Sequence, residues 1–302
     1  MAEARLADLP VGDRPVPPLR GEFEVTVNDA GHIGDVARPL STWEKIQNIT
    51  ALRRAAILIA IALIWQVYAA LLDNPLMLPT FWATAKALVS SFASDELLLK
   101  AWVSISTLFK GYLIGIAIAM VLTSLAVSTR LGNDLLSTLT SMFNPLPAIA
   151  LLPIAMLWFG LGEASLIFVL IHAVLWPLSL NTHSGFMAVS DTLRMAGRNY
   201  GLTGVRYVVH ILIPAAFPSI LAGLKIAWAF AWRTLIAAEL VFGASSGSGG
   251  LGWYIFQNRN ELLIDNVFAG LAMVIIIGLL IENVIFRWIE ARTVQKWGMQ
   301  RQ

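Results

Sequence analysis

The chain has 302 residues, of which 57% are hydrophobic and only 13% charged, and its net charge is +2. A soluble globular domain carries about 25% charged residues. A chain with about half that share cannot cover a water-facing surface in the usual way, so the composition argues against a soluble protein, a disordered protein and a nucleic-acid-binding protein. The absence of cysteine excludes disulfides, thiol catalysis and cysteine metal sites.

The N-terminal region differs from the rest of the chain. Residues 1–40 are rich in proline and scattered charges and contain no long apolar run. They predict a polar cytoplasmic tail and no signal peptide. In residues 41–54, Ser41 and Glu44 have the spacing of a capping box, and apolar residues then recur at helical spacing. This pattern predicts an amphipathic helix on the membrane surface, and the alternative is a solvated linker.

Six apolar segments are long enough to cross a bilayer, which takes about 20 residues at 1.5 Å each. They span residues 55–72, 106–127, 137–158, 164–182, 217–242 and 267–286. The third contains three prolines, and because each proline lacks an N–H donor, it predicts a broken or kinked helix. The expected fold class is an all-α polytopic membrane protein with about six transmembrane helices. Residues 55–287 would form its transmembrane domain and 288–302 a cytoplasmic tail.

Basic residues predict the orientation, because cytoplasmic loops are enriched in Lys and Arg. If the N-terminus is inside, the outer segments hold only Lys86, Lys100 and Arg259. The inner segments hold Arg38, Lys45, Arg53, Arg54, Arg130, Arg194, Arg198, Arg206, Arg287, Arg292, Lys296 and Arg301. We therefore expect both termini in the cytoplasm, together with one sizeable inner loop at 184–216.

The inner loop carries the motif on which the functional prediction depends. It reads Leu-Arg-Met-Ala-Gly-Arg-Asn-Tyr-Gly over residues 193–201, then nine residues, then Ile-Leu-Ile-Pro. This resembles the signature loop of permease subunits in binding-protein-dependent ABC importers, whose pattern is Glu-Ala-Ala, three residues, Gly, nine residues, Ile-x-Leu-Pro. The matching positions are Ala196, Gly201, Ile211 and Pro214.

Two positions depart from that family pattern. Met195 stands where the family has Glu, which affects any ionic contact of that Glu with an ATPase, and Gly197 stands where it has the second Ala. The resemblance implies an ATPase-coupling loop that contains Asp191, Arg194, Met195, Ala196, Gly197, Arg198, Gly201, Ile211 and Pro214. Without the resemblance, the alternative is a basic inner loop that has no partner.

The resemblance extends from about Ala83 to Trp288. The segments at 144–163, 222–239 and 249–252 look like the nitrate/sulfonate/taurine branch of the family. The resemblance implies a type I importer permease in the inner membrane of a prokaryote. It also implies a second permease copy, cytoplasmic ABC ATPase subunits and an extracytoplasmic substrate-binding protein as partners. The implied cargo is a small anionic solute such as nitrate, a sulfonate, taurine or bicarbonate. The alternative is a neutral or aromatic nutrient, because the branch also handles some of these and the chain by itself does not identify the substrate.

Ionisable residues inside a span are functional candidates, because a charge near the bilayer centre costs at least about 2.5–3.5 kcal/mol. In the fifth span, Lys225 and Glu239 share one helix face with Trp228 and Trp232, and Arg233 lies beside that face. Such a face suits either a translocation pathway or a helix–helix seam. Arg233 near mid-depth would lower the desolvation barrier of an anion. The alternative is that it pairs with Glu239 or with another helix.

Other patterns carry less weight. His172 in the fourth span is a further pathway candidate, although a lone intramembrane histidine is more often structural. No histidine has metal-ligand spacing to another, so we expect no metal and no cofactor. The segment 247–252 matches G-x-G-x-x-G but lacks the strand–turn–helix unit that nucleotide binding needs, and is expected to be a flexible outer loop.

No P-loop motif occurs, so ATP would be hydrolysed by a separate subunit and the chain itself would not be an enzyme. Two other classes remain open at this point. One is an ion-gradient-driven secondary transporter, which usually shows internal repeats or paired broken helices. The other is a membrane-embedded enzyme, for which the sequence offers no catalytic constellation.

Overall fold

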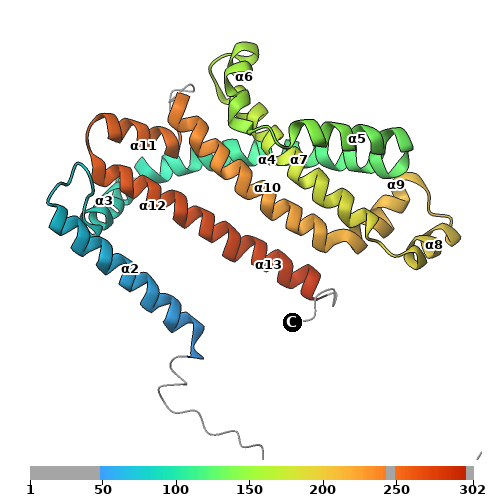
Figure 1. Cartoon of the computed structure of the whole chain (residues 1–302), viewed down its shortest axis with the longest axis horizontal. Coiled ribbons are helices and arrows are strands. Elements are labelled where there is room, and N and C mark those ends of the chain that lie inside the picture. Colours follow the sequence, from blue (N-terminus) through green and yellow to red (C-terminus); the bar gives the residue numbers. More distant parts are fainter. Residues whose placement is uncertain (1–47, 95, 243–248, 297–302) are drawn as a thin grey trace, which may run out of the picture. The chain divides into compact units, whose positions relative to one another are not determined.

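The computed structural model describes residues 48–94, 96–242 and 249–296, and every element in them is a helix (Figure 1). Five of these helices are long and apolar enough to cross a membrane, or six if one bent pair counts as a span. The predicted all-α class is therefore confirmed. Helices dominate because a backbone in hydrocarbon must satisfy its own polar groups. The predicted tail at 1–40 and the first half of the predicted surface helix at 41–54 lie outside the described residues.

The chain divides into two units, Met1–Ile59 and Ala60–Gln302. Helix α2 (Thr50–Leu72) begins in the first unit, and its only buried residue is Ala69. In the second unit, Trp65 fixes the end of α2, because its Nε1 donates to the carbonyl of Pro79 over 2.9 Å. Helix α3 (Phe81–Ala93) follows, and sequence reasoning did not predict it.

Three long helices form the centre of the second unit: α4 (Glu96–Ser128), α7 (Glu163–Met187) and α10 (Ile213–Phe242). Glycines 111 and 115 of α4 face Leu170 and Val174 of α7, so these two helices run parallel. Small residues allow helix backbones to approach closely, which is the main source of helix association in lipid. A Cβ on Gly115 would lie 2.8 Å from the Cβ of Val174.

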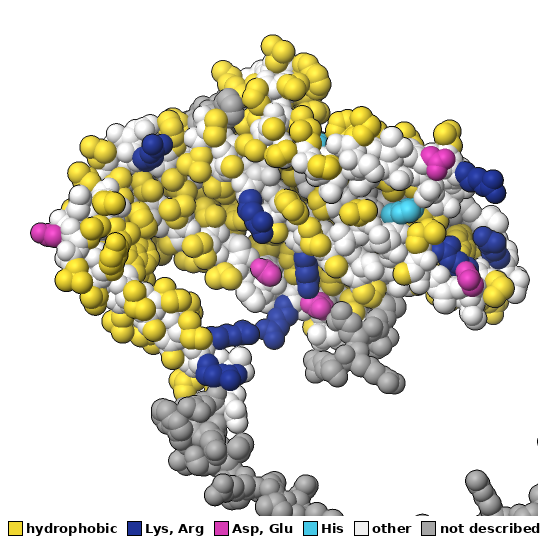
Figure 2. Space-filling model, viewed as in Figure 1, with side chains coloured by type: hydrophobic (Ala, Val, Ile, Leu, Met, Phe, Trp, Pro, Cys, Tyr) yellow, Lys and Arg dark blue, Asp and Glu magenta, His cyan; other side chains and the backbone are white. Residues whose placement is uncertain are grey.

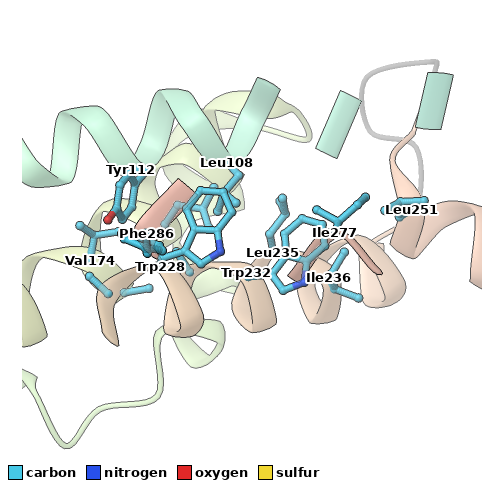
Figure 3. Packing of buried hydrophobic residues seen from close by; sticks show 14 of the residues in the cluster. Leu108, Tyr112, Val174, Trp228, Trp232, Leu235, Ile236, Leu251, Ile277 and Phe286 are labelled. Atoms are coloured by element: carbon cyan, nitrogen blue, oxygen red, sulfur yellow. The ribbon is translucent and has the colours of Figure 1, made fainter. Parts of the chain in front are cut away.

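Helices α7 and α10 run antiparallel. Gly223 of α10 faces Asn181 of α7, and Gly185 of α7 faces Ser219 of α10. Buried aliphatic and aromatic side chains of α4, α7, α10 and the C-terminal helices fill the space between them (Figure 3).

The third predicted span is broken, as its prolines indicate. Helix α5 (Arg130–Phe143) is followed by the short η2 (Ala148–Leu151) and α6 (Leu152–Phe159), with a bend of 88° between the two parts. Because α4 and α7 run parallel, the chain between them has to return along the bundle. The bent pair α5–α6 provides that return.

Both ends of the predicted inner loop at 184–216 are helical. Helix α7 continues to Met187, and one continuous helix runs from Gly204 to Val241. This helix comprises α9 (Gly204–Tyr207), the π-helical η3 (Val208–Leu212) and α10. Pro214 and Pro218 remain within the helix because a wider π turn precedes them. This turn accommodates prolines, which lack the N–H of a regular helical hydrogen bond. Only α8 (Asp191–Asn199) stands apart in the connection.

The last part of the chain is also more helical than predicted. Helix α11 (Leu251–Asn260) follows α10, and α12 (Ile264–Leu280) continues through η4 (Ile281–Phe286), α13 (Arg287–Glu290) and η5 (Ala291–Gln295). The predicted C-terminal tail therefore starts as helix. The second span likewise begins at Glu96 rather than near Ser106.

The α4–α7 packing predicts a difference between two glycine variants. Gly115→Ala should lower the stability of the detergent-solubilised protein by about 1–3 kcal/mol, because the added methyl overpacks the contact with Val174. Gly278→Ala is the control, since its Cβ would meet nothing closer than 3.7 Å. Both changes gain similar helix propensity. Equal melting temperatures of the two variants would contradict this account of the seam.

Candidate coupling helix and translocation pathway

Helix α8 is tied to the end of α7 by Arg194. Its Nε donates to the carbonyl of Val189 over 3.0 Å, and its other guanidinium nitrogen donates to the carbonyl of Phe186. These carbonyls lie at the C-terminal end of α7, where helix carbonyls lack intrahelical partners. Asp191 in the first turn of α8 complements the helix dipole. Arg194 thus holds α8 in place, and its guanidinium is engaged within the chain.

The C-terminus of α8 ends where the sequence predicted a tight turn. Gly201 has φ +71°, a left-handed conformation that favours glycine. Its N–H donates to the carbonyl of Arg198 over 2.9 Å, and the N–H of Leu202 donates to the carbonyl of Gly197 over 3.1 Å. This pair of bonds is a Schellman motif. The prediction that Gly201 ends this helix is confirmed.

One face of α8 packs against the start of the long helix. Gly197 is buried, and a Cβ there would lie 2.8 Å from Cγ1 of Ile211 and 3.2 Å from Tyr207. Gly197, which departs from the family pattern, therefore makes a close contact with Ile211, which matches that pattern. Ala196, Ile211 and Pro214 are half-buried.

The opposite face of α8 is open. Met195 is 58% and Tyr200 is 86% exposed, and Arg198 is also exposed. In Figure 2, charged side chains are few on the visible face, and one group of them lies near α8. Helix α8 is thus an exposed, partly basic helix that is anchored to α7 at one side and to η3 at the other.

Four of the six predicted pathway residues line one cavity of about 260 Å³ between α10 and α12–η4. Its wall includes Lys225, Trp228, Trp232 and Arg233, together with Ala229, Gly278, Glu282 and Phe286. The indole rings of Trp228 and Trp232 are stacked at 6.5 Å, and both side chains are buried (Figure 3). The sequence analysis did not name Glu282 as a pathway residue. The one feature that could have identified it is that it places a carboxylate inside an apolar span.

The two basic side chains at this cavity, Lys225 and Arg233, differ in their partners. Lys225 Nζ lies 2.7 Å from Oε2 of Glu290, so this lysine is paired. Arg233 is exposed, and its guanidinium lies 5.9 Å from the ring centroid of Phe230. No Arg233–Glu239 ion pair occurs in the part of the chain that the structure describes. The alternative in which these two side chains neutralise each other is therefore wrong.

His172 belongs to a second cavity of about 290 Å³, which Pro145, Trp176, Phe230 and Thr234 also line. Within the described ranges, neither ring nitrogen of His172 has a hydrogen-bond partner. The ring makes edge-on contacts with Trp176 and with the ring of Phe143. His172 is therefore separate from the Arg233 cavity, although both cavities border α10.

Glu239, the sixth predicted pathway residue, is only 4% exposed and lies between α4, α10 and α11. In α11, the hydroxyl of Tyr254 lies 2.9 Å from Oγ of Ser91, and burial raises the pKa of this phenol.

Among the described residues, no group of three histidine or carboxylate side chains could hold a metal ion.

The left-handed conformation at Gly201 predicts a conformational rather than a steric effect of substitution. A Cβ at Gly201 would meet nothing within 4 Å. Gly201→Val should therefore lower stability by about 1–2 kcal/mol through backbone strain alone. Gly201→Asn should cost less, because asparagine tolerates this region. Thermal unfolding of the two variants measures the difference, and an equal loss in both would contradict the assigned turn.

Comparison with known proteins agrees with this geometry. Residues 111–295 match the family of binding-protein-dependent transport system inner membrane components. A putative ABC transporter permease protein of Methanocaldococcus jannaschii is 32% identical over 224 residues, 73% of this chain and 83% of the relative. A bicarbonate transport system permease protein of Synechococcus elongatus is 27% identical, over 88% of this chain and 98% of its own.

A taurine transport system permease protein of Escherichia coli is 31% identical over 58% of this chain and 61% of its own length. The family consists of transmembrane components without an ATPase domain, which work with an ATPase and a binding protein. The chain is thus a multi-pass inner membrane protein and belongs to the permease family of binding-protein-dependent ABC transporters.

Proposed function

We propose that this permease, as two copies of the chain, forms the translocation pathway for a small anionic solute and is driven through α8 by a cytoplasmic ATPase. The observation that carries the proposal is the double anchoring of an exposed helix. Helix α8 is fixed to α7 by Arg194 and to η3 by the contact between Gly197 and Ile211.

This anchoring supports a mechanical role. A force applied to the open face of α8 would pass to α7 through the Arg194 hydrogen bonds and to α10 through Ile211. ATP binding would close the two ATPase subunits and draw the two α8 helices together, so that the cavity turns outward. Hydrolysis would return it inward. The ionic contact of the family's Glu is replaced at Met195 by an apolar one, since Met195 is exposed on the open face.

The solute class rests on Arg233 and on the relatives. Arg233 has no ion pair within the described residues and borders a cavity between two spans. A guanidinium in that position replaces part of the water that an anion loses on entering the membrane. The relatives are named for sulfonates, taurine, nitrate and bicarbonate. We therefore assign a solute that carries an anionic group, delivered by the binding protein.

The orientation follows from charge. Arg130, Arg194, Arg198 and Arg206 lie at the α8 end of α10, whereas Lys100 and Arg259 belong to α4 and α11 at its other end. The positive-inside rule then places α8 and both termini in the cytoplasm.

Single cysteines test the orientation and the coupling role together, because the chain has no cysteine of its own. Tyr200→Cys at the C-cap of α8 and Asn260→Cys on α11 are both at exposed positions. In right-side-out vesicles, an impermeant maleimide should label Cys at 260 and should label Cys at 200 only after lysis. Met195→Cys should cross-link to the ATPase subunit.

The control for the cross-link is Asn260→Cys, which should not react with the ATPase. Labelling of position 200 from outside would overturn both the orientation and the coupling role of α8. A purified permease that transports without any ATPase would instead favour an ion-gradient-driven transporter.

The pathway role of Arg233 predicts a loss of uptake on neutralisation. In cells that express the permease with its ATPase and binding protein, Arg233→Met should reduce uptake of labelled taurine, nitrate or bicarbonate by about 10-fold, equivalent to ~1.4 kcal/mol. Arg259→Met is the control, since this arginine is exposed on α11. Normal uptake with intact ATP hydrolysis would remove Arg233 from the pathway.

A further inference from the structure

A buried carboxylate joins three helices at the end of α10 that lies away from α8 (Figure 1). Glu239 comes from α10. The hydroxyl of Ser104 on α4 lies 2.9 and 2.8 Å from its two oxygens and donates to the carboxylate. The N–H of Gly252 on α11 donates to Oε2 over 2.9 Å, and the N–H of Leu251 donates to Oγ of Ser104 over 2.9 Å.

These bonds solve a problem at the start of α11. The first N–H groups of a helix have no intrahelical acceptor, and Gly250 at the N-cap position supplies no side chain. The acceptors come instead from two other helices, Ser104 of α4 and Glu239 of α10. The positive end of the α11 dipole also favours a carboxylate there. Helix α11 is therefore capped by the helices against which it packs.

The glycines of this segment fit the same contact. A Cβ on Gly250 would collide with Oε1 of Glu239 and with Oγ of Ser104. A Cβ on Gly252 would lie 2.5 Å from Cβ of Glu239 and 2.6 Å from the carbonyl oxygen of Ile236. The backbone of α11 thus rests directly on α10. This close approach explains the glycines at 250 and 252, which the sequence placed in a flexible loop.

Stability alone does not require a carboxylate here. Burying one costs free energy, and a well-packed apolar side chain is often at least as stabilising. Lys100 adds an electrostatic attraction to Glu239, and the carboxylate accepts hydrogen bonds from the hydroxyl of Ser104 and the N–H of Gly252. Hydrogen bonds are directional, so they hold one relative placement of the three helices where apolar contacts would permit sliding.

The Glu239 cluster lies at the end of α10 opposite the contact with α8. One continuous helix runs from Gly204 to Val241. The α8 contact at Ile211 and the Glu239 cluster are near its two ends, about 40 Å apart at 1.5 Å per residue. If this helix is displaced at its α8 end, its other end moves as well. The hydrogen bonds of the Glu239 cluster then determine whether α4 and α11 move with it.

We propose that Glu239 and Ser104 are positioning residues that keep α11 joined to α10 and α4 during transport, so that displacement of α8 reaches the opposite end of the permease. This inference rests on the proposed coupling role of α8. It assigns Glu239 a part in the conformational change in place of a contact with the solute.

The test uses the full complex of permease, ATPase and binding protein in liposomes. Ser104→Ala removes the hydroxyl that links α4 to the carboxylate and to α11. Ser106→Ala is the matched control, since among the described residues its hydroxyl bonds only to the carbonyl of Val103 in its own helix. Asn260→Cys carrying a bimane label reports on α11 in each background. Three quantities are measured: ATP hydrolysis, the amount of labelled taurine, nitrate or bicarbonate transported per ATP, and the shift in bimane fluorescence on adding ATP.

We expect Ser104→Ala to keep basal ATP hydrolysis within about twofold of the unmodified complex. Solute transported per ATP should fall at least about fivefold, and the bimane shift should fall by a similar factor. Ser106→Ala should change none of these quantities. Glu239→Gln, which keeps one acceptor oxygen, should lower the transport-per-ATP ratio and the bimane shift by less than Ser104→Ala does.

An unchanged ratio and bimane shift in Ser104→Ala would overturn the inference. So would a parallel fall of hydrolysis, transport and melting temperature in both Ser104→Ala and Glu239→Gln, because that result describes a purely structural contact. If the unmodified complex shows no ATP-driven transport, the proposed function itself fails. If it transports normally and the variants do too, only the inference fails.

Discussion

The close approach of α7 to α4 and α10 is the constraint on which the rest of this permease depends. Lipid tails are as apolar as leucine, so helices in a membrane gain little from hydrophobic association and rely on tight packing and polar contacts. Glycines 111, 115, 185 and 223 lie at these two seams, where a larger side chain would collide. The hydroxyl of Tyr112 on α4 also donates to the carbonyl of Leu224 on α10 over 2.8 Å. These contacts make three spans one body.

In that body, each end of α10 holds a short helix. At one end, α8 is set by Arg194, by the Schellman turn at Gly201 and by the contact of Gly197 with Ile211. At the other end, α11 is set by Glu239 and Ser104. The first amides of α11 are satisfied by neighbouring helices, and α8 in turn satisfies carbonyls at the end of α7 through Arg194. These attachments support the proposed transmission of a displacement from α8 to α11.

The polar groups inside the apolar body separate into two kinds. Lys110 pairs with Glu163 at 2.7 Å, and Lys225 pairs with Glu290 at 2.7 Å, so both lysines are neutralised by a neighbouring helix. Arg233 and His172 border cavities and have no such partner among the described residues. Unpaired polar groups are costly in a membrane unless water, solute or a second subunit meets them. The cavities along α10 are where such a meeting can occur.

The sequence by itself determined the class of protein, because apolar runs long enough for a bilayer and the spacing around Gly201 depend only on local composition and order. It also determined the break in the third span and the end of α8, since proline and glycine act on their own backbone. It misplaced the starts of α4 and α10, because an apolar window cannot detect polar helical turns or a π turn that accommodates Pro214. It missed α3 and α11, which are too short to span.

Only the tertiary structure decided which polar residues belong together. Helical spacing put Glu239 on the same face as Lys225, but the structure joins Glu239 to Ser104 and Gly252, and Lys225 to Glu290. These partners are far apart in the chain. Their pairing follows from how closely glycine-lined helices approach, which depends on packing in three dimensions and leaves no local pattern in the sequence.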